Sequence, residues 1–320
     1  MIQRIRRLLA GSDAGVPLSI GDDAAVLDPG PGTQIVVTTD ALIESVHFDL
    51  GYTPLEDLGW KALAVNLSDL AAMAASPTAA VISMGLPKIW SEKQLDAFYS
   101  GLKQCGQTHA CPIVGGDITA SPGPVMLSVT ALGEVPKNAF VTRSGARPDD
   151  LVCVSGDLGG SLAGLEALRS GPSDRARTAA VCKFLRPIPR IGLAGVLSEV
   201  LHLHAMIDIS DGLASEIHHI CRASRTGAVL DADRIPVHPE AVSVSSQTGR
   251  DPVDTALSSG EEYELLFVIP PEDEDKLGAL KTDPPVCVIG RITDPSQGIA
   301  LKRAGRAETL QVSGWDHFRR

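Results

Sequence analysis

The chain has few aromatic side chains and no excess of positive charge. Phe, Trp and Tyr make up 4% of its 320 residues, and the formal net charge is −11. Proteins that bind nucleic acid or anionic lipid regardless of sequence need clustered Lys and Arg, so neither partner is expected. An anionic ligand would therefore need something other than the bulk charge to attract it.

Long apolar runs and paired cysteines are missing as well. No stretch of about 18 uninterrupted apolar residues occurs, and the first ten residues carry three Arg without the apolar run of a secretory signal. The six cysteines form no CxxC pair, which argues against a zinc site or a disulfide framework. We expect a soluble, cytoplasmic protein that contacts no membrane.

The common nucleotide-binding signatures are also absent. The sequence has no Gly-x-x-x-x-Gly-Lys-Ser/Thr loop, no kinase glycine loop with its strand Lys and no dinucleotide fingerprint. Only Val152–Ser161 runs from a strand pattern through glycines into a helix start, where backbone amides are candidates for holding an oxyanion. A tight interdomain turn explains this segment equally well.

Strand and helix patterns alternate along the chain, which predicts an α/β (mixed α+β) fold. A length of 320 residues exceeds the roughly 250–300 that one core supports, so we predict two domains. The polar segment 135–150 is the predicted seam, which gives an N-terminal domain 1–136 and a C-terminal domain 137–320. The predicted strands are Gln34–Thr39, Ala80–Gly85, Val125–Leu132, Leu151–Ser155, Ala205–Ile209, Leu265–Ile269 and Val286–Ile289. The predicted helices are Leu55–Ala75, Ser91–His109, Ser161–Arg169, Ser173–Phe184, Ile191–Leu201, Gly212–Ser224 and Glu272–Leu280.

Aspartates gather in short segments where predicted strands or loops end. One Asp beside Gly is as often a turn former or helix cap as a ligand, but five such segments together indicate a site. Hard oxygen donors suit Mg²⁺ or Mn²⁺, and this many carboxylates indicate several ions that clamp phosphate groups and supply the missing positive charge. The segments are Gly21–Ala25, Thr38–Asp40, Asn66–Leu70, Gly115–Asp117 and Asp208–Gly212.

Two of these segments carry the strongest local signals. Asp69 lies on a predicted helix that is apolar over most of its circumference, and Asn66 shares the one polar stripe. A partly buried carboxylate is costly without a cation or several donors, so a metal is the favoured partner and capping of a neighbouring loop is the alternative. Strand alternation places Asp208 and Ser210 on one face, while Asp211 opens the next helix, a capping role compatible with metal ligation.

Arg143 lies in the predicted seam. A guanidinium can bind phosphate in bidentate fashion, so this residue is a candidate phosphate clamp, with a solvated linker charge as the equal alternative.

In chain order, these segments resemble the thiamine-monophosphate kinase family, a relative of aminoimidazole ribonucleotide synthetase and selenophosphate synthetase. The resemblance covers nearly the whole chain and is specific only as a set. It comprises Gly21–Ala24, Thr38–Asp40 with Val46–Phe48, Asn66–Met73, Gly115–Asp117, Thr142–Gly145, Asp208–Leu213, Gly260–Leu266 and Gly314–Phe318.

The resemblance implies ATP-dependent phosphorylation of thiamine monophosphate to thiamine diphosphate by direct in-line transfer, with several Mg²⁺ ions, for which Mn²⁺ can substitute. It also implies a homodimer formed through the sheets of the N-terminal domain. The implied metal ligands are Asp23, Thr38, Thr39, Asp40, Asp69, Asp117, Asp208 and Asp211. The implied ATP contacts are Tyr99, Gly116, Asp117, Arg143 and Ser210, and the implied thiamine contacts are His47, Glu261 and Trp315. The implied catalytic set is Asp40, Asp69, Asp117, Arg143 and Asp211.

Two positions depart from the family pattern. Ser259 stands where the family usually has a second glycine, and Glu262 stands where it usually has Asp. We expect the first change to stiffen the substrate loop and the second to keep the charge on a longer side chain.

Rival functions are an enzyme like aminoimidazole ribonucleotide synthetase and a non-catalytic scaffold that binds nucleotide and metal. The C-terminal segment Gly314–Phe318 argues against the first, and the intact set of Asp ligands argues against the second. Selenophosphate synthetase chemistry is disfavoured because the first fifty residues contain neither Cys nor Lys.

Overall fold

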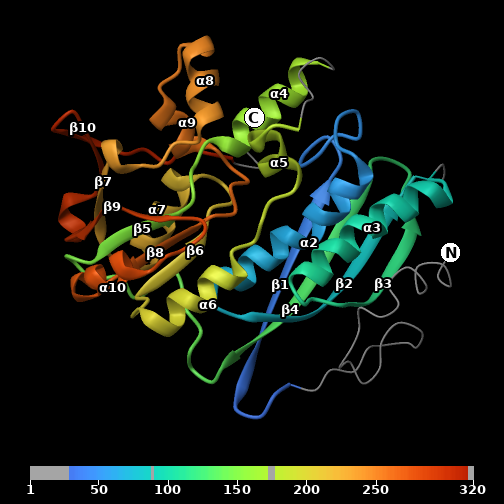
Figure 1. Cartoon of the computed structure of the whole chain (residues 1–320), viewed down its shortest axis with the longest axis horizontal. Helices are drawn as coiled ribbons and strands as arrows, with labels where there is room; N and C mark the ends of the chain where they lie inside the picture. Colours follow the sequence, from blue (N-terminus) through green and yellow to red (C-terminus); the bar gives the residue numbers. More distant parts are fainter. Residues whose placement is uncertain (1–28, 88–89, 172–176, 316–320) are drawn as a thin grey trace. The chain divides into compact units, whose positions relative to one another are not determined.

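The computed structural model describes residues 29–87, 90–171 and 177–315. The chain forms two compact units. The first contains the described residues up to Leu70 and Ala75–Phe140, and the second contains Ala71–Ala74 and the described residues from Val141 onward. Each unit has its own sheet with packed helices (Figure 1), which confirms the predicted mixed α/β fold. None of the described helices is both long and apolar enough to cross a membrane.

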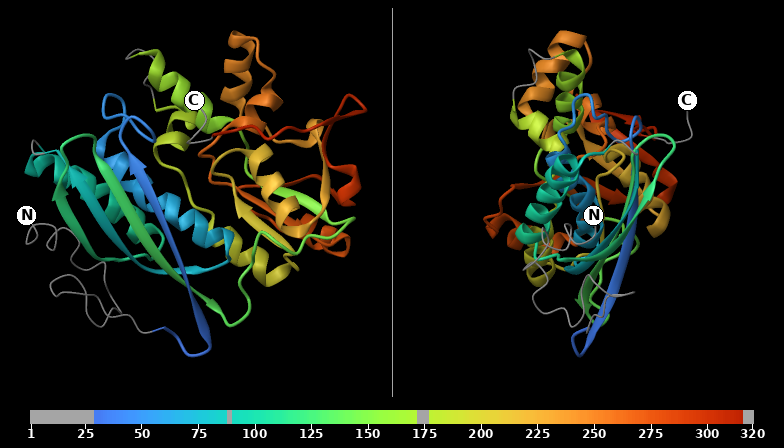
Figure 2. Two further views of the ribbon diagram at one scale, coloured as in Figure 1. Left: turned by 180° about the vertical axis from the view of Figure 1, so that it is seen from behind. Right: turned by 90° about the vertical axis from the view of Figure 1, so that its right-hand side faces the viewer.

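The first unit is built on a four-stranded sheet with the order β1-β4-β2-β3. Strand β4 pairs antiparallel with both β1 and β2, while β2 and β3 run parallel. Helices α2 and α3 pack on the same face of this sheet (Figure 2). The elements are β1 (Thr33–Ile43), α2 (Leu55–Ala72), β2 (Ser76–Leu86), α3 (Glu92–Thr108), β3 (Ile113–Ala120) and β4 (Met126–Pro136).

Helices α2 and α3 touch backbone to backbone. A Cβ placed on Gly101 of α3 would lie 1.7 Å from the Glu56 carbonyl oxygen, and one placed on Gly59 of α2 would lie 1.9 Å from the Phe98 carbonyl oxygen. Only glycine permits this approach at both positions. Ser91 caps α3 in a reciprocal capping box with Gln94, so the start of the helix is fixed as well.

Gly101→Ala should lower the free energy of unfolding by about 3 kcal/mol, because the added methyl overlaps the backbone of α2 and the helices must separate. Chemical denaturation measures this loss. Gly195→Ala, in α6 of the second unit, is the matched control. A Cβ there meets nothing within 4 Å, so this change should raise stability by about 0.5 kcal/mol. Equal stability of the two variants would contradict the close helix contact.

The second unit contains a seven-stranded mixed sheet with the order β11-β10-β7-β9-β5-β8-β6. One core joins the sheet to α7 and α9, and another joins it to α6 and α10. Helices α4, α5 and α8 share a smaller alanine-rich cluster. The elements are β5 (Leu151–Ser155), α4 (Gly160–Ser170), α5 (Ala179–Leu185), α6 (Ile191–Val200), β6 (Ala205–Asp208), α7 (Leu213–Ser224), β7 (Gly227–Asp231), α8 (Pro239–Thr248), α9 (Pro252–Ser258), β8 (Leu265–Ile269), α10 (Glu274–Ala279), β9 (Val286–Thr293), β10 (Ile299–Arg303) and β11 (Arg306–Thr309).

Candidate active site

In the first unit, β1 and α2 bring three predicted site residues together. The Thr38 hydroxyl donates a hydrogen bond to Asp69 Oδ2, and the Asp40 amide donates to Asn66 Oδ1 over 3.0 Å. Asn66 is fully buried, and its Nδ2 donates to the Ala62 carbonyl at 3.2 Å. The predicted polar stripe of α2 therefore faces β1 and fixes the two strand residues.

The Asp40 carboxyl has an unusual charge environment. Burial, followed by repulsion from Asp69, raises its pKa to about 6. A divalent cation beside the pair would favour the ionised forms and remove the repulsion. All these donors are oxygens, so the cluster fits a hard ion such as Mg²⁺ or Mn²⁺.

Thr39 and Asp117 are not brought into this cluster. Successive strand residues face opposite sides, and the Thr39 hydroxyl donates to the Val129 carbonyl at 3.0 Å, away from Asp69. In the strand register, Gly116 on β3 lies in the same cross-strand row as Asp40 on β1, and three strand-to-strand steps separate the two residues. Asp117 follows Gly116 directly on β3. With strands about 4.8 Å apart, the backbones of Asp40 and Asp117 are roughly 14 Å apart, too far for one ion to bind both carboxylates.

Two further predicted contacts of the first unit have local partners. The buried Tyr99 hydroxyl donates to Met84 Sδ at 3.3 Å, and burial raises the pKa of the phenol. His47 accepts the Ile43 amide at Nδ1 over 3.0 Å, so its neutral ring carries the proton on Nε2. At Gly116, a Cβ would lie 2.1 Å from the Ile82 carbonyl oxygen, which explains the glycine. Asp23 lies outside the described residues.

In the second unit, the turn after β6 is held by two distant segments. The Ser210 carbonyl accepts the Glu261 amide at 2.6 Å, and the Asp211 carbonyl accepts the Trp315 amide at 3.0 Å. The Trp315 side chain remains 52% exposed beside this turn. Predicted metal ligands and predicted thiamine contacts of this unit, including the buried Asp208, therefore occupy one neighbourhood.

The expectation that Asp211 caps the following helix is wrong. The capping position is Gly212, with φ +125°, and this residue has no side chain that could cap α7. A Cβ at Gly212 would also lie 3.0 Å from the Leu257 carbonyl oxygen. Only glycine adopts this backbone without strain, so α7 starts at Leu213, one residue after the predicted start, and Asp211 lies before the capping position.

Sequence reasoning missed Glu216, in the first turn of α7. One carboxylate oxygen accepts the Asp211 amide at 2.9 Å. Burial, followed by repulsion from Asp211 and Asp208, raises the pKa of the carboxyl to about 8, and the Asp211 hydrogen bond offsets this only in part. The available signal was spacing, because Glu216 lies three residues after Leu213 and four before Ile220, on the apolar face of the helix.

The glycine loop after β5 does hold an oxyanion, and that oxyanion belongs to the protein. The Gly159 and Ser161 amides donate to Glu262 Oε1 at 2.8 and 3.1 Å. The Ser259 hydroxyl donates to the same oxygen at 2.5 Å and accepts the Leu162 amide at 3.2 Å. The two positions that depart from the family pattern are thus bonded to each other, and together they tie the Glu261 segment to the start of α4.

Glu264, three residues after Glu261 in the chain, is the second anchor of this segment. Its oxygens accept hydrogen bonds from Arg190 Nε at 2.8 Å, Lys183 Nζ at 2.9 Å and Ser155 Oγ at 2.6 Å. Burial opposes ionisation, but the two cations outweigh it and hold the pKa of Glu264 below its usual value.

The backbone between these anchors is strained. Glu261 and Tyr263 have φ +58° and +52°, a region that non-glycine residues rarely adopt. The buried carboxylates of Glu262 and Glu264 hold this conformation, which is typical of functional segments.

Ser259→Ala should lower the free energy of unfolding by about 1–2 kcal/mol, because Glu262 and the Leu162 amide each lose a buried partner. Denaturant titration measures the loss. The neighbouring Ser258→Ala is the control, since its hydroxyl donates to the Asp254 carbonyl of its own exposed helix turn, and a loss of less than about 0.5 kcal/mol is expected. An equally small effect at both serines would contradict the anchoring role of Ser259.

Arg143 lies beside β6 and α7. The carbonyl of its neighbour Thr142 accepts the Met206 amide at 2.9 Å, and the Arg143 charge contributes, after burial, to lowering the pKa of His219 on α7. The structure thus places this guanidinium in the same unit as Asp208 and Asp211.

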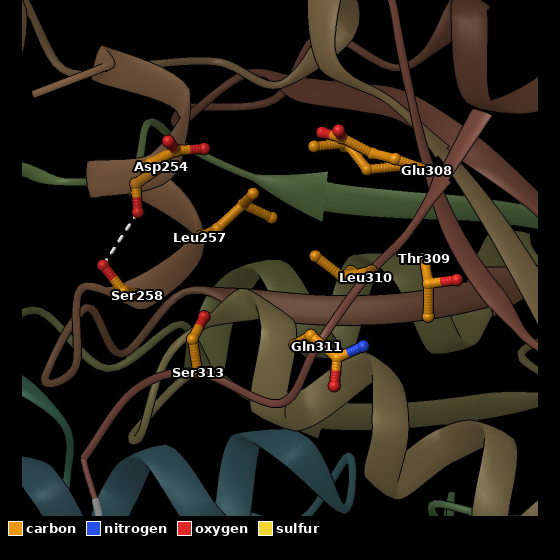
Figure 3. A pocket seen from close by; sticks show the side chains of 9 residues that line it. Asp254, Leu257, Ser258, Glu308, Thr309, Leu310, Gln311 and Ser313 are labelled. Atoms are coloured by element: carbon orange, nitrogen blue, oxygen red, sulfur yellow. Dashed lines mark hydrogen bonds between the residues drawn. The ribbon is translucent and has the colours of Figure 1, made fainter. Parts of the chain in front are cut away.

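A surface hollow of about 310 Å³ also lies in the second unit (Figure 3). Its lining includes the apolar Leu257, Leu301 and Leu310 and the acidic Asp254 and Glu308. None of the predicted site residues lines it, so it is separate from the candidate site. Within the described ranges, no group of three or more His, Cys, Asp or Glu side chains is arranged to hold a metal ion.

Comparison with known proteins decides the family. Residues 21–135 match the N-terminal domain of AIR synthase related proteins, and residues 147–302 match the C-terminal domain. Thiamine-monophosphate kinase of Bacillus subtilis is 32% identical over 315 residues, covering 96% of this chain and 95% of that protein. The Escherichia coli K12 enzyme of the same name is 35% identical and covers 99% and 97%. The chain belongs to the thiamine-monophosphate kinase family.

Solved structures agree with this membership, and the predicted resemblance is confirmed. Thiamine-monophosphate kinase from Stenotrophomonas maltophilia is 36% identical with a TM-score of 0.84 and covers 96% of each chain. A structure of AaThiL complexed with AMPPCP and TMP is 32% identical with a TM-score of 0.79, covering 99% of this chain and 96% of that one. The Escherichia coli hydrogenase maturation protein HypE, at 20% identity and a TM-score of 0.78, shares the fold. The chain is thus a member of a kinase family.

Proposed function

We propose that this protein transfers the γ-phosphoryl group of ATP directly to thiamine monophosphate and forms thiamine diphosphate. The observation that carries the proposal is the match along nearly the whole chain to AaThiL, a protein solved with AMPPCP and TMP. The two acidic clusters in the structure are the second support, because a chain of net charge −11 needs cations to receive two anionic substrates.

Several Mg²⁺ ions are part of this proposal, with Mn²⁺ as a substitute. Asp40 and Asp69, with Thr38, would hold metal in the first unit, and Asp208 and Asp211 would do so in the second. Bound ions would neutralise the phosphate oxygens and stabilise charge that develops during transfer. Asp23, Thr39 and Asp117 are the remaining proposed ligands. Thr39 and Asp117 would serve ions other than the one beside Asp40 and Asp69, because the structure does not bring them to that pair.

The remaining site residues receive substrate roles. Tyr99, Gly116, Asp117, Arg143 and Ser210 are assigned to ATP, and His47, Glu261 and Trp315 to thiamine monophosphate. The exposed Trp315 ring offers a face to the cationic thiazolium, an arrangement that a cation–π interaction favours. The bonded turn of Ser210, Asp211, Glu261 and Trp315 supports the assignment, since it joins proposed contacts of both substrates.

We also propose that the protein is a homodimer formed through the sheet of the first unit. Ile35 and Val37 on β1 are 46% and 61% exposed, on the strand face opposite Thr38. An apolar strip of this kind on a sheet is typical of an interface.

The decisive experiment incubates the purified chain with Mg²⁺, ATP and thiamine monophosphate and follows ADP together with thiamine diphosphate. Equal amounts of both products are expected. An enzyme like aminoimidazole ribonucleotide synthetase would make no thiamine diphosphate, and a scaffold would release no ADP that depends on the acceptor. Either result would overturn the proposal.

A further inference from the structure

Glu216 is buried against the two proposed metal ligands of the second unit. Glu216 is 1% exposed. Its acidic neighbours are Asp208, at the end of β6, and Asp211, in the following turn. One of its oxygens accepts the Asp211 amide at 2.9 Å, which fixes the backbone that carries the Asp211 carboxylate.

The other carboxylate oxygen, Oε2, is buried and has no hydrogen-bond partner in the part of the chain that the structure describes. A buried oxygen of this kind costs free energy unless a donor meets it. Its acidic neighbours Asp208 and Asp211 supply acceptors when ionised and cannot satisfy it. A divalent cation beside these three carboxylates would favour their ionised forms, and an ionised Glu216 has no donor of its own. The missing donor would then come from a bound group, and a water molecule on the cation has the right chemistry, because Mg²⁺ keeps several of its waters.

We propose that Glu216 is a positioning residue of the metal site. It holds the Asp211 turn through one oxygen and accepts a hydrogen bond from metal-bound water through the other. The inference rests on the proposed function. Carboxylates that bind the ligands or waters of a metal in this way typically change metal affinity about 10- to 100-fold when they are removed.

The alternative is a purely structural role, in which Glu216 only stabilises the start of α7 through its hydrogen bond with the Asp211 amide. Glu216→Gln separates the two roles because a Gln carbonyl oxygen can still accept the Asp211 amide, while the amide nitrogen at the second position can only donate. Glu240→Gln is the matched control. Glu240 also lies in the first turn of a helix, α8, and one of its oxygens accepts a backbone amide, that of Ala180, at 3.1 Å.

The test titrates Mn²⁺ into wild type, Glu216→Gln and Glu240→Gln in the presence of AMPPCP, and electron paramagnetic resonance measures the free ion. At least one Mn²⁺ should bind about tenfold more weakly to Glu216→Gln, with unchanged affinity in Glu240→Gln and unchanged circular dichroism in both. Wild-type affinity in folded Glu216→Gln would overturn the positioning role and leave the proposed reaction standing. Absence of Mn²⁺ binding to wild type would overturn the metal-dependent function itself.

Discussion

Replacing Asp69 by Asn is expected to lower turnover at least about 100-fold while the protein stays folded. The Asp69 carboxylate accepts the Thr38 hydroxyl and repels Asp40, so it is held where a cation would be stabilised by both charges. Asn keeps the shape and the hydrogen bond but removes one of the two charges. Steady-state kinetics with thiamine monophosphate and ATP measures the loss.

Folding serves as the internal check on this variant. Because repulsion between Asp69 and Asp40 is relieved, the melting temperature without metal should be equal or higher. Asp96→Asn, on α3 of the same unit, removes one charge from a residue without an assigned role and should keep normal turnover. Near-normal turnover in folded Asp69→Asn would refute the proposed metal role of Asp69.

Replacing Glu264 by Gln should lower the free energy of unfolding by about 3–5 kcal/mol. The side chain is fully buried, and Arg190 and Lys183 both bond to it. The variant removes the carboxylate that both cations share, and Lys183 then keeps, among the described residues, only Glu262 and Asp157 as acidic partners. Urea denaturation monitored by circular dichroism measures the change.

Glu166→Gln is the control for this effect. Glu166 pairs with Arg250 at 3.2 Å, but both side chains reach solvent, and a loss below about 1 kcal/mol is expected. If Glu264→Gln were no more damaging than Glu166→Gln, the buried network could not be what anchors the segment of Glu261 and Tyr263.

Strong periodic segments made most of the fold predictable. Leu55–Ala75 was predicted as a helix because apolar residues cover it, and α2 ends within a few residues of that prediction, at Ala72. Strand β3 was missed because Gly115, Gly116 and Asp117 resemble a loop, although Gly116 permits a close approach to β2. Such packing cannot be inferred without the neighbouring strand.

Other missed elements have weak local signals. The hairpin of β10 and β11 is rich in charged residues, β7 has only five residues, and α8 and α9 are short helices that begin with proline. Helix α5 begins at Ala179, whereas the pattern predicted Ser173. The division of the units after Phe140 lies four residues past the boundary predicted at 136.

The site was partly predictable for a similar reason. Asp69 and Asn66 were found because a polar stripe on an apolar helix is conspicuous, and the structure places both against β1. The sequence did not predict the roles of Glu216 and of the Ser259–Glu262 bond. The partners that show the role of Glu262, such as the Gly159 amide, lie far away in the sequence. The spacing of Thr39 and Asp117 likewise gave no information about which face or row of the sheet they occupy.

The bond from the Trp315 amide to the Asp211 carbonyl has a consequence for biosynthesis. Residue 315 leaves the ribosome after every other residue that the structure describes, 104 positions behind its partner. While the nascent chain emerges, β6 and α7 can pair and pack, but the turn that connects them lacks this hydrogen bond until residue 315 has been made. The Asp211 turn should accordingly reach its final conformation only after β6 and α7 have both formed.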